Sequence, residues 1–279
     1  MSPGTISPLA SIKALAFDVF GTVVDWRTSV VDELTLRAHR KVTAPADSST
    51  LTQALRSKLE TSPPDWAKFA QAWRDSYGQF TKGFNAERDE WKTVDEHHRE
   101  SLVSLLNDWG LEGLYSDAEI ESLSLVWHRL MPWEDSSTGL RKLKSEGGYQ
   151  LATLSNGNTS LLSDLVDFAP DGLAFDRLLS AETFGAYKPD PRTYRGTVEA
   201  LLGEWDGRMG EVAMVAAHLG DLQAARGLGM RTVYVEREGE ESWGEDEERY
   251  QEAKQWVDLW VGLGEGGFER VADHLQTLS

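Results

Sequence analysis

The sequence predicts an α/β fold, a doubly wound parallel sheet that is interrupted by an inserted all-helical domain. Three observations predict it. Residues 14–18 form an apolar run typical of a buried strand. Residues 26–133 lack such runs and show helical spacing with many charges. After residue 133, strand, turn and helix patterns alternate, as they do where crossover helices join parallel strands.

The individual elements follow from the spacing of apolar residues and from turn residues between them. After the first strand and the helical segment, the expected strands are 149–154, 177–180, 211–217 and 231–235, and the expected helices are 161–166, 193–202 and 222–228. Residues 1–27 and 136–279 would therefore form one discontinuous α/β core, and residues 28–135 a helical domain. The acidic run within residues 236–249 is typical of a solvated loop, and we assign it no function.

The amino-acid composition narrows the range of partners and functions that this chain can have. The formal net charge of −18 over 279 residues disfavours nucleic acids and anionic membranes as partners. The absence of cysteine excludes disulfides, thiolate zinc sites and cysteine nucleophiles. No signal sequence or membrane-spanning stretch is recognisable, which favours a cytoplasmic protein. The 11 tryptophans suggest that a partner, such as a second copy in a homodimer, covers part of the helical segment.

The first strand stops at a single carboxylate, Asp18, and the chain then turns through Gly21 and Thr22. In α/β proteins the carboxyl ends of parallel strands carry the chemistry, so Asp18 is a candidate catalytic group. An aspartate at this place can also simply cap the next helix.

Three later segments add polar groups at the same predicted edge. Ser155 and Asn156 follow a strand and could hold an anion, although a Ser-Asn-Gly turn is common before a helix. Lys188 lies in a loop stiffened by two prolines and could act as a fixed positive charge, although most lysines are solvated. His218 ends a fourth strand, and Asp221 opens the next helix, which it might only cap.

Together these segments resemble the haloacid dehalogenase superfamily, and most closely its type II 2-haloacid dehalogenase branch. The matching stretches are Phe-Asp-Val-Phe-Gly-Thr at 17–22, Leu-Ser-Asn-Gly at 154–157 and Tyr-Lys-Pro-Asp-Pro-Arg-Thr-Tyr at 187–194. The resemblance implies a Rossmann-like core with a helical cap. It also implies hydrolysis of short 2-haloalkanoic acids to 2-hydroxy acids, through an ester formed on Asp18.

The resemblance assigns roles to the other motif residues. Thr22, Ser155 and Asn156 would position Asp18 and the substrate carboxylate, and Lys188 would offset the two negative charges that meet there. Tyr194 and Asp221 would support Lys188 and the hydrolytic water.

The residue two positions after the nucleophile separates the branches. Phosphatases of this superfamily carry a second Asp there as acid and base, and they bind magnesium through further carboxylates. This chain has Phe20, which we expect to line the substrate site, and alanines at 216 and 217 where a metal ligand would lie. The resemblance therefore implies no metal or other cofactor, because a halide leaves without protonation.

The halide would be received by the cap. Trp66, Phe69, Trp73 and Tyr77 recur at helical spacing, and Arg74 follows directly, so the resemblance makes Arg74 the halide-binding residue. Such an aromatic stripe also serves as the core of a helical domain, and Arg27 is a competing candidate.

The fourth motif departs from the branch. Well-known members carry Ser and Asn where this chain has Ala216 and His218. His218 could act as a general base for the hydrolytic water, or it could be a structural histidine that shapes the pocket.

Two other function classes stay open at this point. One is a magnesium-dependent phosphatase or phosphonatase-like hydrolase, which Phe20 and the alanines disfavour. The other is a non-catalytic binding member, because a fold alone does not guarantee activity.

Overall fold

The structure, a computed structural model, describes residues 7–45 and 51–278. The chain separates into two compact units. One unit is formed by Met1–Asp25 and Pro132–Ser279, and the other by Trp26–Met131. The two-residue strands β2 (Val24–Asp25) and β3 (Met131–Pro132) mark the points where the chain leaves the first unit and returns to it.

A six-stranded parallel sheet forms the centre of the first unit. Its strands lie in the order β5 (Arg177–Ser180), β4 (Gln150–Ser155), β1 (Ala14–Phe17), β6 (Val212–Ala216), β7 (Arg231–Val235) and β8 (Leu259–Val261). The first strand lies inside the sheet and the later strands add on both sides of it. This arrangement confirms the predicted doubly wound fold and all five predicted strands. The sequence analysis missed β8, which has three residues and is only partly buried.

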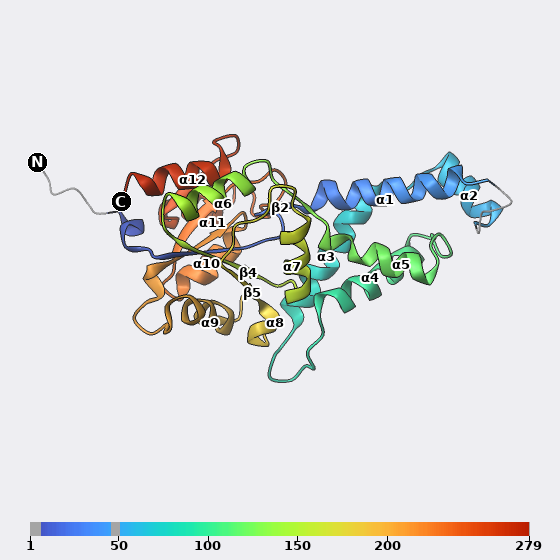
Figure 1. The fold of residues 1–279 in the computed structure, drawn as a ribbon. Helices are drawn as coiled ribbons and strands as arrows, with labels where there is room; N and C mark the ends of the chain where they lie inside the picture. The colour runs from blue at the N-terminus through green and yellow to red at the C-terminus, as the bar shows by residue number, and fades with distance from the viewer. Residues whose placement is uncertain (1–6, 46–50, 279) are drawn as a thin grey trace, which may run out of the picture. The chain divides into compact units, whose positions relative to one another are not determined.

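Helices cover both faces of this sheet, as Figure 1 shows. Phe17 of β1 points to the side of α12 (Gly267–Gln276), where its ring meets that of Phe268 edge-on at 5.2 Å between centroids. Helix α6 (Ser136–Ser145) packs beside α12 on this face.

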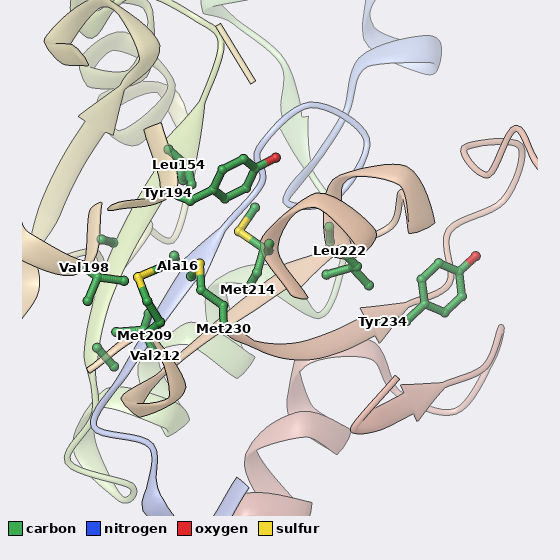
Figure 2. Close-up of a cluster of buried hydrophobic side chains, with 14 of the residues drawn as sticks. Ala16, Leu154, Tyr194, Val198, Met209, Val212, Met214, Leu222, Met230 and Tyr234 are labelled. Carbon is green, nitrogen blue, oxygen red and sulfur yellow. The ribbon is translucent and has the colours of Figure 1, made fainter. Parts of the chain in front are cut away.

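The opposite face carries the larger apolar cluster of the first unit. There α9 (Pro191–Leu202), α10 (Leu219–Gly227) and α11 (Glu248–Trp256) contribute side chains to it. Figure 2 shows Met214 of β6 lying among side chains of α9 and α10, including Tyr194 and Leu222. Because neighbouring residues of a strand point to opposite faces, Ala16 lies in this cluster while Phe17 faces α12. The remaining elements of the unit are η1 (Pro8–Ser11), α7 (Thr159–Phe168), α8 (Ala181–Phe184) and η3 (Met209–Glu211).

The second unit consists mainly of helices joined by loops, as its spacing predicts. It contains α1 (Trp26–Thr43), α2 (Gln53–Thr61), α3 (Trp66–Gly83), α4 (Val94–Asp108), α5 (Asp117–Ser124) and η2 (Leu125–His128). Thr93 and Ser116 begin α4 and α5 with capping boxes that satisfy the first backbone N–H groups. Phe69 and Trp73 of α3 are fully buried, so most of the aromatic stripe is core.

None of the helices that the structure describes is both long enough and apolar enough to cross a membrane.

The contact between Phe17 and Phe268 predicts a large stability effect. We expect Phe268→Ala to lower the free energy of unfolding by about 3–5 kcal/mol, because it removes a fully buried ring and leaves a cavity against the sheet. Phe168→Ala is the matched control, since Phe168 is largely exposed at the end of α7 and should lose far less. Urea unfolding measures both variants, and equal losses would contradict this account of the core.

Candidate active site

The polar residues that follow three neighbouring strands meet at one edge of the sheet. Asp18 comes directly after β1, Ser155 ends β4, and His218 lies two residues after β6. Since β4 and β6 both pair with β1 in parallel, their carboxyl ends bring these residues together. The site therefore lies where strands depart to either side of β1, the usual position for chemistry in open α/β sheets.

Asp18 is the centre of a hydrogen-bond network and is only 7% exposed. Its Oδ2 accepts a hydrogen bond from Thr22 Oγ1 at 2.7 Å, and its Oδ1 accepts one from Lys188 Nζ at 2.8 Å. Thr22 is itself fixed, because its Oγ1 accepts from the backbone N–H of Ala217 at 2.9 Å. The carboxylate is thus held in one orientation by groups from three loops.

Lys188 joins two carboxylates. Its Nζ also donates to Asp221 Oδ2 at 2.5 Å, and Tyr194 donates its hydroxyl to Asp221 Oδ1 at 2.6 Å. Burial by itself lowers the pKa of Lys188, but the charges of Asp18 and Asp221 raise it above its ordinary value. Lys188 therefore stays positive beside the candidate nucleophile.

The same contacts keep Asp18 ionised. Burial raises the pKa of a carboxyl group, but the positive charge of Lys188 and the hydrogen bond and charge of His218 outweigh it. The pKa of Asp18 lies well below its ordinary value as a result. The group is a carboxylate throughout the neutral range, as a nucleophile must be.

His218 lies between two carboxylates. Its Nδ1 is 3.0 Å from Asp18 Oδ2, and its Nε2 is 3.3 Å from Glu240 Oε2. Burial lowers the pKa of His218, but the hydrogen bonds and charges of Asp18 and Glu240 raise it to about 9. At neutral pH His218 is accordingly an imidazolium that donates to both partners.

The predicted substrate-binding residues of the core surround this network. Asn156 Oδ1 accepts a hydrogen bond from the backbone N–H of Lys188 at 2.8 Å. Ser155 Oγ accepts a hydrogen bond from the backbone N–H of Gly157 at 3.1 Å. Phe20 is buried, and its ring lies so close to Gly157 that a Cβ there would be 3.1 Å away. These side chains shape the loops around Asp18, and their contacts to a substrate remain a prediction.

Both arginine candidates belong to the second unit and lie on aromatic rings there. The Arg74 guanidinium carbon is 4.6 Å from the Tyr77 ring centroid and 5.7 Å from that of Trp26. Arg27 lies 4.6 Å from the Trp26 ring. Both are anchored by cation–π contacts, and the choice between them as the halide-binding residue remains a prediction.

The prediction that the acidic run within residues 236–249 is a solvated loop is wrong in part. The Glu240 side chain is only 5% exposed and contacts His218, and Arg237 is buried in an ion pair with Asp135. Sequence reasoning missed Glu240 because it stands among several acidic residues with nothing in the pattern to mark it. Only the tertiary fold places this one glutamate beside the histidine.

Among the residues that the structure describes, no group of three or more His, Asp or Glu side chains could hold a metal ion. Ala216 and Ala217 are buried at the end of β6 and offer no side-chain oxygen. The positive charge next to Asp18 comes from Lys188 and His218 instead.

Comparison with known proteins identifies the family of the chain. Residues 12–229 match the model of the haloacid dehalogenase-like hydrolases. This chain belongs to that family. A defluorinating L-2-haloacid dehalogenase is 31% identical with a TM-score of 0.76, and the match covers 98% of this chain and 99% of the other. A second L-2-haloacid dehalogenase is 33% identical with a TM-score of 0.73, covering 95% and 99% of the two chains.

The curated relatives of this chain are also 2-haloacid dehalogenases. The (S)-2-haloacid dehalogenase 4A of Burkholderia cepacia is 29% identical over 232 residues, which are 82% of this chain and 85% of that protein. The (S)-2-haloacid dehalogenase of Xanthobacter autotrophicus is also 29% identical, over 83% of this chain and 78% of that protein. As a haloacid dehalogenase-like hydrolase with these relatives, the chain falls in the L-2-haloacid dehalogenase branch.

The charge of His218 can be tested directly. In Asp18→Asn the anion at 3.0 Å is replaced by a neutral amide, so we expect the pKa of His218 to fall from about 9 toward its ordinary 6.5. A group with a raised pKa stabilises the folded state fully below 6.5 and loses that contribution as pH rises through 9. NMR titration of the His218 ring measures the shift. An unchanged pKa in the variant would contradict the pairing with Asp18.

Proposed function

We propose that this chain hydrolyses short 2-haloalkanoic acids to 2-hydroxy acids through an aspartyl ester, without a metal ion. The single observation that carries the proposal is the ionised Asp18 held by Lys188, Thr22 and His218. A carboxylate kept charged in a buried site and fixed in orientation is suited to attack an sp³ carbon.

The proposed reaction has two steps. In the first, an Asp18 oxygen attacks the carbon that bears the halogen, the carbon–halogen bond breaks, and the halide leaves with the bonding electrons. In the second, water attacks the carboxyl carbon of Asp18 and the ester oxygen leaves as the hydroxyl of the product. Attack from the rear inverts the configuration of the substrate carbon. Lys188 offsets the repulsion between Asp18 and the anionic substrate as they approach.

Phe20 supports a dehalogenase over a phosphatase. An alkoxide that leaves phosphorus needs a proton from an acid, whereas a halide is stable as an anion and needs none. Phe20 is buried and has no acidic group, so the site lacks an acid at this position.

The second unit completes the proposal. We infer that residues 28–135 act as a cap on the α/β core, with Arg74 as the acceptor of the leaving halide. The guanidinium presents N–H donors that suit a weakly hydrated anion.

The substrates would then be a small 2-haloacid and water. A cytoplasmic location and a homodimeric state, suggested by the sequence, belong to the same proposal.

Halide release tests the proposed activity. We expect the wild type to release halide from chloroacetate, bromoacetate or one enantiomer of 2-chloropropionate in the presence of a chelator, with fluoroacetate assayed alongside. Asp18→Asn should abolish release, because the amide is not a nucleophile. Phosphate release from esters only after magnesium is added, with no halide release, would overturn the proposal in favour of a phosphatase.

Loss of His218 should separate the two steps. In His218→Ala we expect the ester to accumulate on Asp18, because the first step needs no base and the second uses one. Mass spectrometry of the quenched protein detects the adduct on the peptide that contains Asp18. Normal turnover of the ester would remove His218 from the general-base role.

A further inference from the structure

Glu240 reaches the active site from a segment outside all four motifs. It lies between β7 and α11, and its Oε2 is 3.3 Å from His218 Nε2. The side chain is 5% exposed, although the surrounding segment is acidic and largely at the surface. A glutamate is almost never buried without a partner that stabilises its charge, and here the imidazole of His218 is that partner.

The backbone of the neighbouring turn leaves a defined space for the Glu240 carboxylate. Gly21, in the turn after Asp18, has φ +81°, and a Cβ there would be 1.9 Å from Glu240 Oε2. The turn therefore leaves room for the carboxylate only because residue 21 is glycine. Two neighbours fix the segment: Arg237 Nε donates to Thr22 O at 3.1 Å, and Glu241 Oε2 accepts from the Leu219 N–H at 2.6 Å.

These contacts give the two ring nitrogens of His218 different partners. Nε2 faces Glu240, and Nδ1 faces Asp18, the residue that would carry the ester. The charged groups that face the ring are Asp18 and Glu240, while Lys188 and Asp221 lie one contact further along the network. Ester formation removes the charge of Asp18 and leaves Glu240 as the anion paired with His218.

We propose that Glu240 is a positioning residue for ester hydrolysis: it holds the Nε2–H of His218, so that Nδ1 faces Asp18 and accepts a proton from the hydrolytic water. The inference rests on the proposed function. It resembles the way in which a buried carboxylate orients the histidine of a hydrolytic triad.

The protons balance through His218. When Asp18 becomes a neutral ester, Nδ1 gives its proton to solvent, which is the one proton that the overall reaction releases. Water then gives a proton to Nδ1 as its oxygen bonds to the carboxyl carbon of Asp18. As the bond from that carbon to the ester oxygen breaks, Nδ1 returns this proton to the departing alkoxide. The remaining proton of the water passes from the new Asp18 carboxyl group to Nδ1 and restores the imidazolium.

Asp221 is less suited to this task. One of its oxygens accepts from Lys188 and the other from Tyr194, at 2.5 and 2.6 Å. Both oxygens of Asp221 are thus already engaged by donors, so neither is placed to take a proton from the hydrolytic water. Burial and the charge of Asp221 also raise the pKa of Tyr194 well above its ordinary value, so that its hydroxyl keeps donating. His218 is the group that can become a neutral base when the ester forms, because loss of the Asp18 charge lowers its pKa and lets Nδ1 release its proton.

Glu240→Gln tests the proposal in the full chain. Gln has nearly the same size but no charge, and Glu238→Gln is the matched control because Glu238 is exposed in the same segment. With 2-chloropropionate in single turnover, we expect Glu240→Gln to form the ester and release halide in a burst. Hydrolysis of the ester should slow by about 10- to 100-fold, part of the 10²–10⁴ that a general base contributes. Glu238→Gln should match the wild type in both steps.

Two readouts separate positioning from a general loss of structure. The pKa of His218, titrated by NMR in the free enzyme, should fall in Glu240→Gln and stay unchanged in Glu238→Gln. Glu240→Asp retains the charge and should restore part of the hydrolysis rate, and it replaces Glu240→Gln if that variant does not fold.

The proposal is overturned if Glu240→Gln hydrolyses the ester as fast as Glu238→Gln. Equal slowing of halide release and ester hydrolysis would also overturn it, because Glu240 would then support Asp18 rather than the base. If the wild type releases no halide at all, the proposed function fails and hydrolytic positioning fails with it. The NMR titration is independent of turnover and still shows whether Glu240 sets the charge of His218.

Discussion

The active site depends on one buried ammonium group between two carboxylates. Lys188 contacts Asp18 and Asp221, and all three side chains are about nine-tenths buried. Removing two carboxylates from water is costly, and each would otherwise be driven to take up a proton. The ammonium offsets that cost because charges at 2.5 to 2.8 Å interact strongly in a site with little water. Lys188, together with His218, allows Asp18 to be both buried and ionised.

The sheet topology explains how residues so distant in sequence form this network. Asp18 and Lys188 are 170 positions apart, and Asp18 and His218 are 200 apart. Parallel strands all end at the same edge, so each crossover returns the chain to the site with a new loop. The helical unit is inserted after β2 and does not alter the register of β1 with β4 and β6. A large insertion is compatible with the site because the chain leaves and re-enters the α/β unit through β2 and β3 and not within a strand of the six-stranded sheet.

Most of the sheet and most of the site residues could be predicted from the sequence, whereas strand β8 and Glu240 could not. Buried parallel strands are continuous apolar runs, so β1, β4 and β6 and the polar residues after them were visible. The short edge strand β8 has little apolar signal, and it was missed. Glu240 was missed for a different reason. Its role depends on the missing side chain of Gly21 and on a contact across 22 positions with His218, and neither leaves a local pattern.

The geometry of displacement explains why the core network cannot be the whole catalyst. In an attack from the rear, the halide leaves on the side of the carbon opposite to Asp18. The two cations of the core site, Lys188 and His218, are hydrogen-bonded to the Asp18 carboxylate. They therefore lie on the same side of the substrate carbon as the attacking oxygen. Stabilising the departing anion therefore requires a further group on the opposite side of the substrate carbon. An arginine of the helical unit is suited to this, because a guanidinium remains charged and binds weakly hydrated anions without a compensating proton transfer. Under the proposed assignment, the halide acceptor and the two cations that bind Asp18 come from separate parts of the sequence, Arg74 from α3 and Lys188 and His218 from the α/β unit.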